Sequence, residues 1–115
     1  MDYSKLTDQE INLLVAKIQH PDKTFIESKT RSPSVVMLNH INMWIDYCNN
    51  PADAWPIIAS NQISLMYEEA MGKWCAGKPY WVDGCEWQLD IDVMDANPLR
   101  SAMIFFLMMQ EGQHA

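Results

Sequence analysis

The chain uses the dipeptide Asn-Pro twice, at Asn50-Pro51 and at Asn97-Pro98, each time directly before a stretch with helical character. Asparagine is a favourable N-cap because its side-chain oxygen accepts a hydrogen bond from an amide that has no partner in the first turn. Proline suits that turn because no amide donor is needed there. The two dipeptides therefore predict helices over residues 50–60 and 97–111, and the chain between them has the alternating pattern of strands.

Another helix is predicted near the amino end. Thr7-Asp8-Gln9-Glu10 is a capping box, in which the Thr7 hydroxyl and the Glu10 carboxylate each accept from an unpaired backbone amide. Apolar residues follow at helical spacing until Pro21 ends the pattern, so we expect a helix over residues 7–19.

Two groups of strands are predicted between the helices. Thr24–Ile26 and Val35–Leu38 favour a hairpin, and the ambiguous segment His40–Cys48 is interpreted as a short third strand. Further along, Ile63–Glu68 and Lys73–Ala76 favour strands. The clearest alternation is Cys85–Val93, with one apolar and one acidic face. Gly77-Lys78-Pro79 and Asp83-Gly84 are predicted as turns.

These elements predict a single α+β domain over residues 1–115, with helices packed on a small antiparallel sheet of about four to six strands in a layered α/β sandwich. The last helix is apolar nearly all round, so it is either central to the core or covered by a partner. Gly112 is expected to end it in a left-handed cap. The predicted core consists of Ile11, Leu14, Val15, Trp55, Ile58, Leu65, Leu89, Leu99, Met103 and Phe106.

The charge balance restricts the classes of partner. The net charge is -7, from 15 acidic and 8 basic residues, which disfavours nonspecific binding to nucleic acid or to anionic membranes. The polar, acidic start of the chain does not resemble a secretory leader, and no apolar run approaches the length of a membrane span. Three cysteines without close spacing favour reduced thiols, so we expect a cytoplasmic protein.

Aromatic residues supply the candidate binding site. Trp74, Tyr80, Trp81 and Trp87 cluster in the predicted hairpin region, and exposed aromatic residues are common binding anchors. The acidic residues Asp83, Glu86 and Asp90 near them would suit a basic protein partner. The alternative interpretation is that these side chains pack in the core.

The alternative to a binding site for a protein is a metal site. Asp90, Asp92 and Asp95 could hold Mg²⁺ or Ca²⁺ through carboxylate oxygens, since Asp90 and Asp92 point to the same side of a strand. The same residues are also typical of a solvated strand face. The cysteines and histidines have no local zinc spacing and nothing marks a thiol as activated, so we expect no cofactor.

The order and spacing of several segments resemble the NinX-like proteins of lambdoid phages and prophages, which are small proteins of unknown function. The segments that carry the resemblance are MDYSKL, DYCNNPADAWPII, ISL, NPLR, AMI and FLMMQE. Residues 77–94 are the part least like the family, which suggests a surface hairpin that varies between relatives. The resemblance implies a phage or prophage origin, a bacterial cytoplasmic setting and, more distantly, a helix-sheet-helix sandwich. It transfers no catalytic residue.

The leading hypothesis is a non-enzymatic phage accessory protein that binds a host or phage protein. A metal-dependent nuclease or hydrolase that uses Asp90, Asp92 and Asp95 is one alternative. A structural homodimer closed through the last helix is the other.

Overall fold

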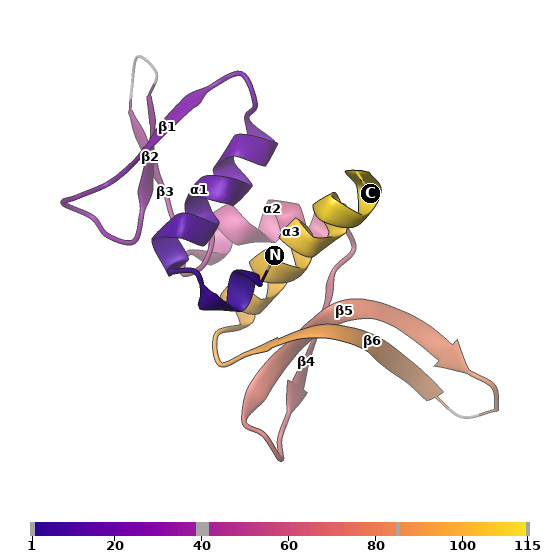
Figure 1. The fold of residues 1–115 in the computed structure, drawn as a ribbon. Coiled ribbons are helices and arrows are strands. Elements are labelled where there is room, and N and C mark those ends of the chain that lie inside the picture. The colour runs from indigo at the N-terminus through magenta and orange to yellow at the C-terminus, as the bar shows by residue number, and fades with distance from the viewer. Residues whose placement is uncertain (1, 39–41, 85, 115) are drawn as a thin grey trace.

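The computed structural model describes residues 2–38, 42–84 and 86–114. They form an elongated molecule of 55 × 29 × 25 Å, in which the helices lie between two small sheets (Figure 1). In chain order the elements are η1 (Tyr3–Lys5), α1 (Asp8–Gln19), β1 (Thr24–Glu27), β2 (Val35–Leu38), β3 (Met43–Ile45), α2 (Pro51–Ser60), β4 (Ser64–Glu68), β5 (Lys73–Val82), β6 (Glu86–Asp95) and α3 (Pro98–His114).

The strands form two antiparallel sheets, ordered β1-β2-β3 and β4-β5-β6. The α+β class is confirmed, as are the first hairpin and the short third strand. The prediction of one sheet was wrong, because α2 separates β3 from β4 and the helices pack between the two groups of strands (Figure 1). The layering is therefore sheet, helices, sheet, the reverse of the sandwich that the resemblance implied.

The three predicted helix starts are confirmed by their caps. The Thr7 hydroxyl accepts from the Glu10 amide at 3.1 Å, and the Glu10 carboxylate accepts from the Thr7 amide at 2.9 Å. The side-chain oxygens of Asn50 and Asn97 accept from amides two residues ahead, at 3.0 and 2.9 Å. The predicted cap at Gly112 was wrong, because α3 continues to His114 and Gly112 has no left-handed backbone.

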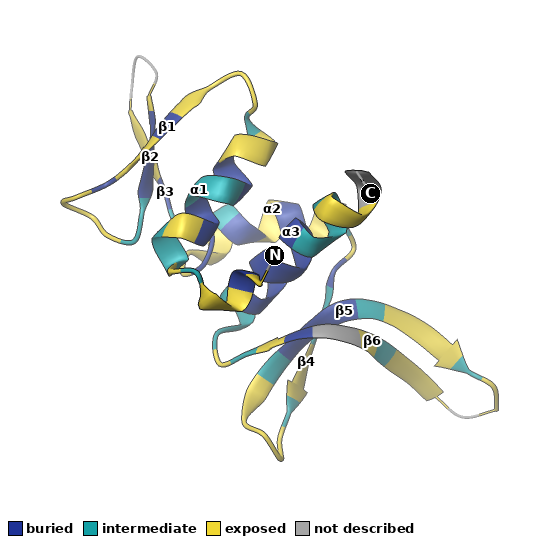
Figure 2. Cartoon of the chain, in the orientation of Figure 1, coloured by how far each residue is buried: buried dark blue, intermediate teal, exposed yellow. Residues whose placement is uncertain are grey.

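Helix α3 is the centre of the core, and it contacts α1, α2 and the strands of the second sheet. Every residue from Ser101 to Leu107 is buried, so its apolar circumference is covered by this chain itself along that length (Figure 2). Burial within one chain therefore explains why the helix is apolar nearly all round, and the homodimer through α3 stays a prediction.

The predicted core is confirmed in part. The buried members are Ile11, Val15, Ile58, Met103 and Phe106, whereas Leu14, Leu65, Leu89 and Leu99 are half-buried. Trp55 was wrongly placed in the core, because 63% of it is exposed. The buried residues of α2 are Ala54, Ile57 and Ile58, and the step of about 100° from Ala54 carries Trp55 off this face.

The predicted turn at Gly77-Lys78-Pro79 was also wrong, because β5 continues through these residues. The pairing of β5 with β6 shifts between Ala76 and Gly77, and a Cβ on Gly77 would lie 2.0 Å from the Asp90 carbonyl oxygen. Glycine is therefore required for a close backbone approach rather than for a reversal of the chain. The actual reversal is at Asp83-Gly84, as predicted.

Candidate functional site

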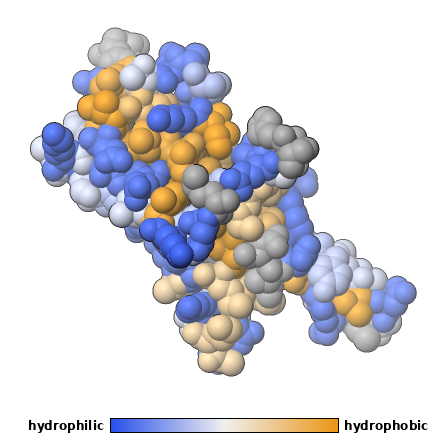
Figure 3. Space-filling model, in the orientation of Figure 1, coloured by the Kyte–Doolittle hydropathy of each residue, from blue (hydrophilic) through white to orange (hydrophobic). Residues whose placement is uncertain are grey.

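The outer parts of β5 and β6 project from the body of the molecule. Strand β4 pairs with β5 only as far as Gly77, so beyond it Lys78–Val82 and Glu86–Asp90 form a two-stranded ribbon, here called the arm. The space-filling view shows the arm as a separate protrusion (Figure 3). Two-stranded ribbons gain little stability alone, so the arm depends on its continuity with the three-stranded base.

The register divides the arm into two faces. Directly paired residues share a face of an antiparallel ribbon, and the face alternates along each strand. Trp81 pairs with Trp87 and Pro79 with Leu89, which places these four residues on an apolar face. The pairs Lys78–Asp90, Tyr80–Gln88 and Val82–Glu86 form the opposite, polar face.

The apolar face is open to solvent at its outer end. Trp81 and Trp87 are 52% and 66% exposed, and their rings meet edge to face with centroids 5.4 Å apart. Each tryptophan therefore has one ring contact inside the arm and a large uncovered surface. A rigid aromatic pair of this kind presents apolar area with few rotatable bonds to fix on binding.

The polar face is bonded within the chain. The Tyr80 hydroxyl donates to Gln88 Oε1 at 3.0 Å, and Gln88 Nε2 donates to Glu86 Oε1 at 3.3 Å. The Lys78 ammonium donates to the carbonyl oxygens of Asn61 and Gln62, just before β4. These contacts occupy polar groups of this face, whereas the tryptophan pair on the apolar face keeps more than half of its surface exposed.

The four predicted aromatic residues do not form one cluster. Trp81 and Trp87 come together, but Tyr80 lies on the opposite face of the arm. Trp74 lies at the base, where it is half-buried against Tyr67 with ring centroids 5.2 Å apart. The acidic residues Glu86 and Asp90 also lie on the face opposite the tryptophan pair.

The predicted aspartate site is only partly described. Asp95 is engaged within the chain, because its carboxylate accepts from Arg100 Nε at 3.2 Å and from the Asn97 amide at 2.8 Å. Asp90 is exposed on the arm, and the side chain of Asp92 lies outside the described residues. Within the described part of the chain, no three His, Cys, Asp or Glu residues are grouped to hold a metal ion.

The described thiols are not activated. Cys48 and Cys75 are buried and free, and desolvation raises the pKa of each above its ordinary value. A raised thiol pKa reduces the thiolate fraction at neutral pH, so neither residue has the character of a nucleophile. Cys85 lies outside the described residues.

A second arrangement, which we call the junction, surrounds Arg100 at the start of α3. The guanidinium donates to the Asp8 carboxylate at 2.7 Å and to the backbone oxygens of Ser4 and Leu6 at 3.1 and 2.8 Å, in addition to Asp95. Burial opposes its charge, but the hydrogen bonds and charges of Asp8 and Asp95 outweigh this, and the pKa of Arg100 is raised. Arg100 therefore ties η1 and α1 to the start of α3.

The junction continues through three asparagines. Asn97 Nδ2 donates to the Cys48 carbonyl at 2.8 Å and to Asn49 Oδ1 at 3.2 Å, and Asn49 Nδ2 donates to Asp8 Oδ2 at 3.2 Å. Asn12 is fully buried: it donates to Asp46 Oδ1 at 2.8 Å and accepts from the Cys48 amide at 3.0 Å. Among the described residues, no buried side-chain nitrogen or oxygen is left without a hydrogen bond. The junction is thus internally satisfied and has a structural role.

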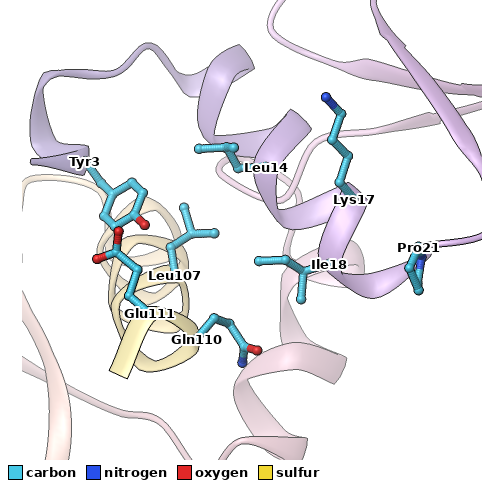
Figure 4. Close-up of a pocket in the computed structure, with 8 residues that line it drawn as sticks. All are labelled: Tyr3, Leu14, Lys17, Ile18, Pro21, Leu107, Gln110 and Glu111. Atoms are coloured by element: carbon cyan, nitrogen blue, oxygen red, sulfur yellow. The ribbon is translucent and has the colours of Figure 1, made fainter. Parts of the chain in front are cut away.

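An open groove runs between α1 and the end of α3, with a volume of about 810 Å³ (Figure 4). Leu14 and Ile18 of α1 face Leu107 of α3 across it. The Tyr3 hydroxyl lies beside the Glu111 carboxylate, and burial and this hydrogen bond raise the pKa of Tyr3 to about 12. The lining combines these aliphatic side chains with Lys17, Gln110 and the Tyr3–Glu111 pair.

Sequence reasoning found the residues of the arm and, from the alternation over Cys85–Val93, the apolar and acidic faces of β6, but it grouped Tyr80 with the tryptophans and missed the junction. The pairing beyond Gly77 decides which residues of β5 join each face, and a glycine inside an alternating strand often marks a bulge that shifts the register. No local signal reveals the partners of Arg100, because Ser4, Leu6 and Asp8 lie more than 90 positions away along the chain.

The comparisons with known proteins relate the chain to a family through its sequence and not through a solved structure. A family model described as "Bacteriophage P22, NinX" matches residues 2–110. None of the curated proteins and none of the solved structures matches the chain. In the described part of the molecule, no helix has the length and apolar character needed to cross a membrane.

Proposed function

Because the chain belongs to the bacteriophage P22 NinX family, we propose that this phage accessory protein binds another protein through its arm, without chemistry of its own. The observation that carries the proposal is the exposure of Trp81 and Trp87 side by side at the end of a projecting ribbon. Neighbouring exposed aromatic residues are typical of the centre of a protein interface.

The apolar area is large enough to support binding. A buried tryptophan removes roughly 150–250 Å² from water, and more than half of each of these two side chains is still available. At about 25 cal/mol per Å², covering both would contribute about 5 kcal/mol before the entropic cost of association. This contribution supports a specific but moderate interaction, and neighbouring contacts on the apolar face would add to it.

The arrangement of charge favours an apolar contact over the basic partner that the sequence suggested. Glu86 and Asp90 lie on the polar face, and Glu86 already accepts a hydrogen bond within the arm. Asp83 lies in the turn between the two strands and is not assigned to the polar face. It is close in sequence to the tryptophan pair. We therefore expect binding through the arm to depend weakly on salt.

The test is affinity capture with the full chain as bait, from lysates of infected and uninfected host cells. A double variant, Trp81→Ala with Trp87→Ala, is compared with Trp55→Ala, which removes an equally exposed tryptophan from α2. The same protein should be retained by the wild type and by Trp55→Ala but lost with the double variant. Equal retention by all three baits would refute the role of the arm.

A further inference from the structure

A second exposed apolar face lies on the first sheet, at the opposite end of the long axis from the arm (Figure 1). The inner face of this sheet, with Phe25, Val35, Met37 and Ile45, is buried and packs on α1. The outer face carries Ile26, Leu38 and Trp44, which are 50%, 40% and 45% exposed, around Val36.

Arg31 gives this outer face a charge. Its guanidinium lies over the Trp44 ring, 4.2 Å from the centroid, so the cation is held on the apolar surface. None of the ion pairs found among the described residues includes Arg31, although the chain has 15 acidic residues. The outer face is therefore suited to an apolar group that brings a carboxylate with it.

The end of the arm has this chemistry. Trp81 and Trp87 supply the apolar surface, and Asp83 in the adjoining turn supplies an exposed carboxylate. Asp83 is also absent from the ion pairs found in the described part of the chain. We propose that the occupant of the outer face is the arm of a second copy, so that two chains form a reciprocal, two-fold dimer with Asp83 of each copy close to Arg31 of the other.

The geometry favours a reciprocal dimer over a single contact. The arm and the outer face lie at opposite ends of one chain, so a two-fold axis across its middle brings each arm to the sheet of the other copy (Figure 1). Covering the exposed parts of Trp81 and Trp87 in one arm-to-sheet contact buries about 400 Å² over the two surfaces, whereas two contacts bury about 800 Å², the size of a weak interface. In each contact the apolar face of the ribbon would pack on the outer face of the sheet, as the two layers of a sandwich do.

This inference rests on the proposed function, because it uses the same arm and names a second copy of the chain as the protein bound. The test is sedimentation equilibrium of the full chain at about 2 and about 200 μM, where a weak dimer passes from mostly dissociated to mostly associated. Wild type and Trp55→Ala should dimerise equally. Trp44→Ala, and the double variant Trp81→Ala with Trp87→Ala, should each weaken dimerisation at least about tenfold.

Two mixtures identify the contact. Trp44→Ala mixed with the arm double variant restores one intact arm-to-sheet contact, so the mixture should associate more strongly than either variant alone. Arg31→Asp and Asp83→Arg should each weaken dimerisation severalfold, and the two together in one chain should restore it. Circular dichroism of each variant checks that it is folded.

A wild type that stays monomeric would overturn the inference, as would a dimer that is indifferent to Trp44→Ala. The failures of the two proposals are distinguishable. If the wild type is monomeric but captures a protein that the arm double variant loses, only the proposal that a second copy binds the arm is refuted. If the dimer forms and the arm captures nothing else, the second copy is the arm's partner.

Discussion

The junction around Arg100 and the arm of β5 and β6 are both rich in side chains able to interact, but they differ in where those interactions are completed. In the junction, charged and amide groups from η1, α1, the start of α2 and the start of α3 satisfy one another. On the arm, the polar face is bonded internally while the apolar face is open. The polar groups of the junction are therefore bonded within the chain, whereas the apolar face of the arm is open to a partner.

The difference between the junction and the arm affects which properties can be inferred from the family resemblance. Two of the segments that carry it, DYCNNP and NPLR, supply Asp46, Asn49, Asn97 and Arg100 to the junction. These residues bond to one another within the chain, so the segments of the resemblance that reach the junction have a structural role. The arm remains the region that we propose for the recognition of a partner.

Arg100→Ala gives the largest expected effect and tests whether the junction is structural. Removing the guanidinium takes one donor from each of Asp8, Asp95 and two backbone oxygens, in a site where the Arg100 side chain is only 13% exposed. We expect a loss of about 3 kcal/mol in the free energy of unfolding, measured by urea denaturation. Lys29→Ala is the control, since that exposed cation takes part in none of the ion pairs found among the described residues and should change stability by less than about 0.5 kcal/mol.

Gly77→Ala should have the next largest effect and tests whether the arm depends on the bulge at its base. The added Cβ meets the Asp90 backbone, which cannot give way without a change in the pairing of β5 and β6, so we expect a loss of about 2 kcal/mol. In Gly112→Ala, the new methyl group meets nothing within 4 Å inside α3. That control should be neutral or stabilising by about 0.5 kcal/mol. Loss of stability in both variants would contradict this explanation.

Alkaline pH should weaken the body of the molecule through Tyr47, which is buried there. Burial, and secondarily the charge of Asp53, raise the pKa of Tyr47 from 10.0 to about 12. As the pH rises, Tyr47 therefore loses its hydroxyl proton in the unfolded chain before it does so in the folded chain. The contribution of neutral Tyr47 to the free energy of unfolding is complete below pH 10 and is lost as the pH rises toward 12. We expect a fall on the order of 1–2 kcal/mol, measured by denaturation at each pH, and a smaller fall for Tyr47→Phe. A fall that Tyr47→Phe leaves unchanged would assign it to other groups.

The smallest effect on stability is expected for Trp87→Ala, which tests the other side of the comparison. Its side chain is 66% exposed and contacts Trp81 edge to face, so the free energy of unfolding should change by less than about 1 kcal/mol. Association should still be weakened in the capture and sedimentation experiments. A large loss of stability would mean that Trp87 supports the fold and is not reserved for a partner.

Local signals predicted the helices well, because a cap is decided by residues within one turn, as at Thr7 and Asn50. The partition into two sheets depends on which distant strands pair, and alternation along a strand gives its faces but not its neighbours. Gly77-Lys78-Pro79 has the composition of a turn. The glycine is required there for a different reason, because the backbones of β5 and β6 approach closely at this point. The two faces of β6 were evident from its alternation, but which residues of β5 share each face was decided by the register beyond that bulge.

The bonds of Arg100 also set an order of events during synthesis. Its acceptors at Ser4, Leu6 and Asp8 leave the ribosome well before Arg100 and the central helix. A growing chain that has not yet made α3 therefore lacks both the centre of the core and the contacts of Arg100 with the amino end, so this part of the fold should form only after α3 has been made. Shortened products that stop before α3 would expose apolar surface and should be readily degraded.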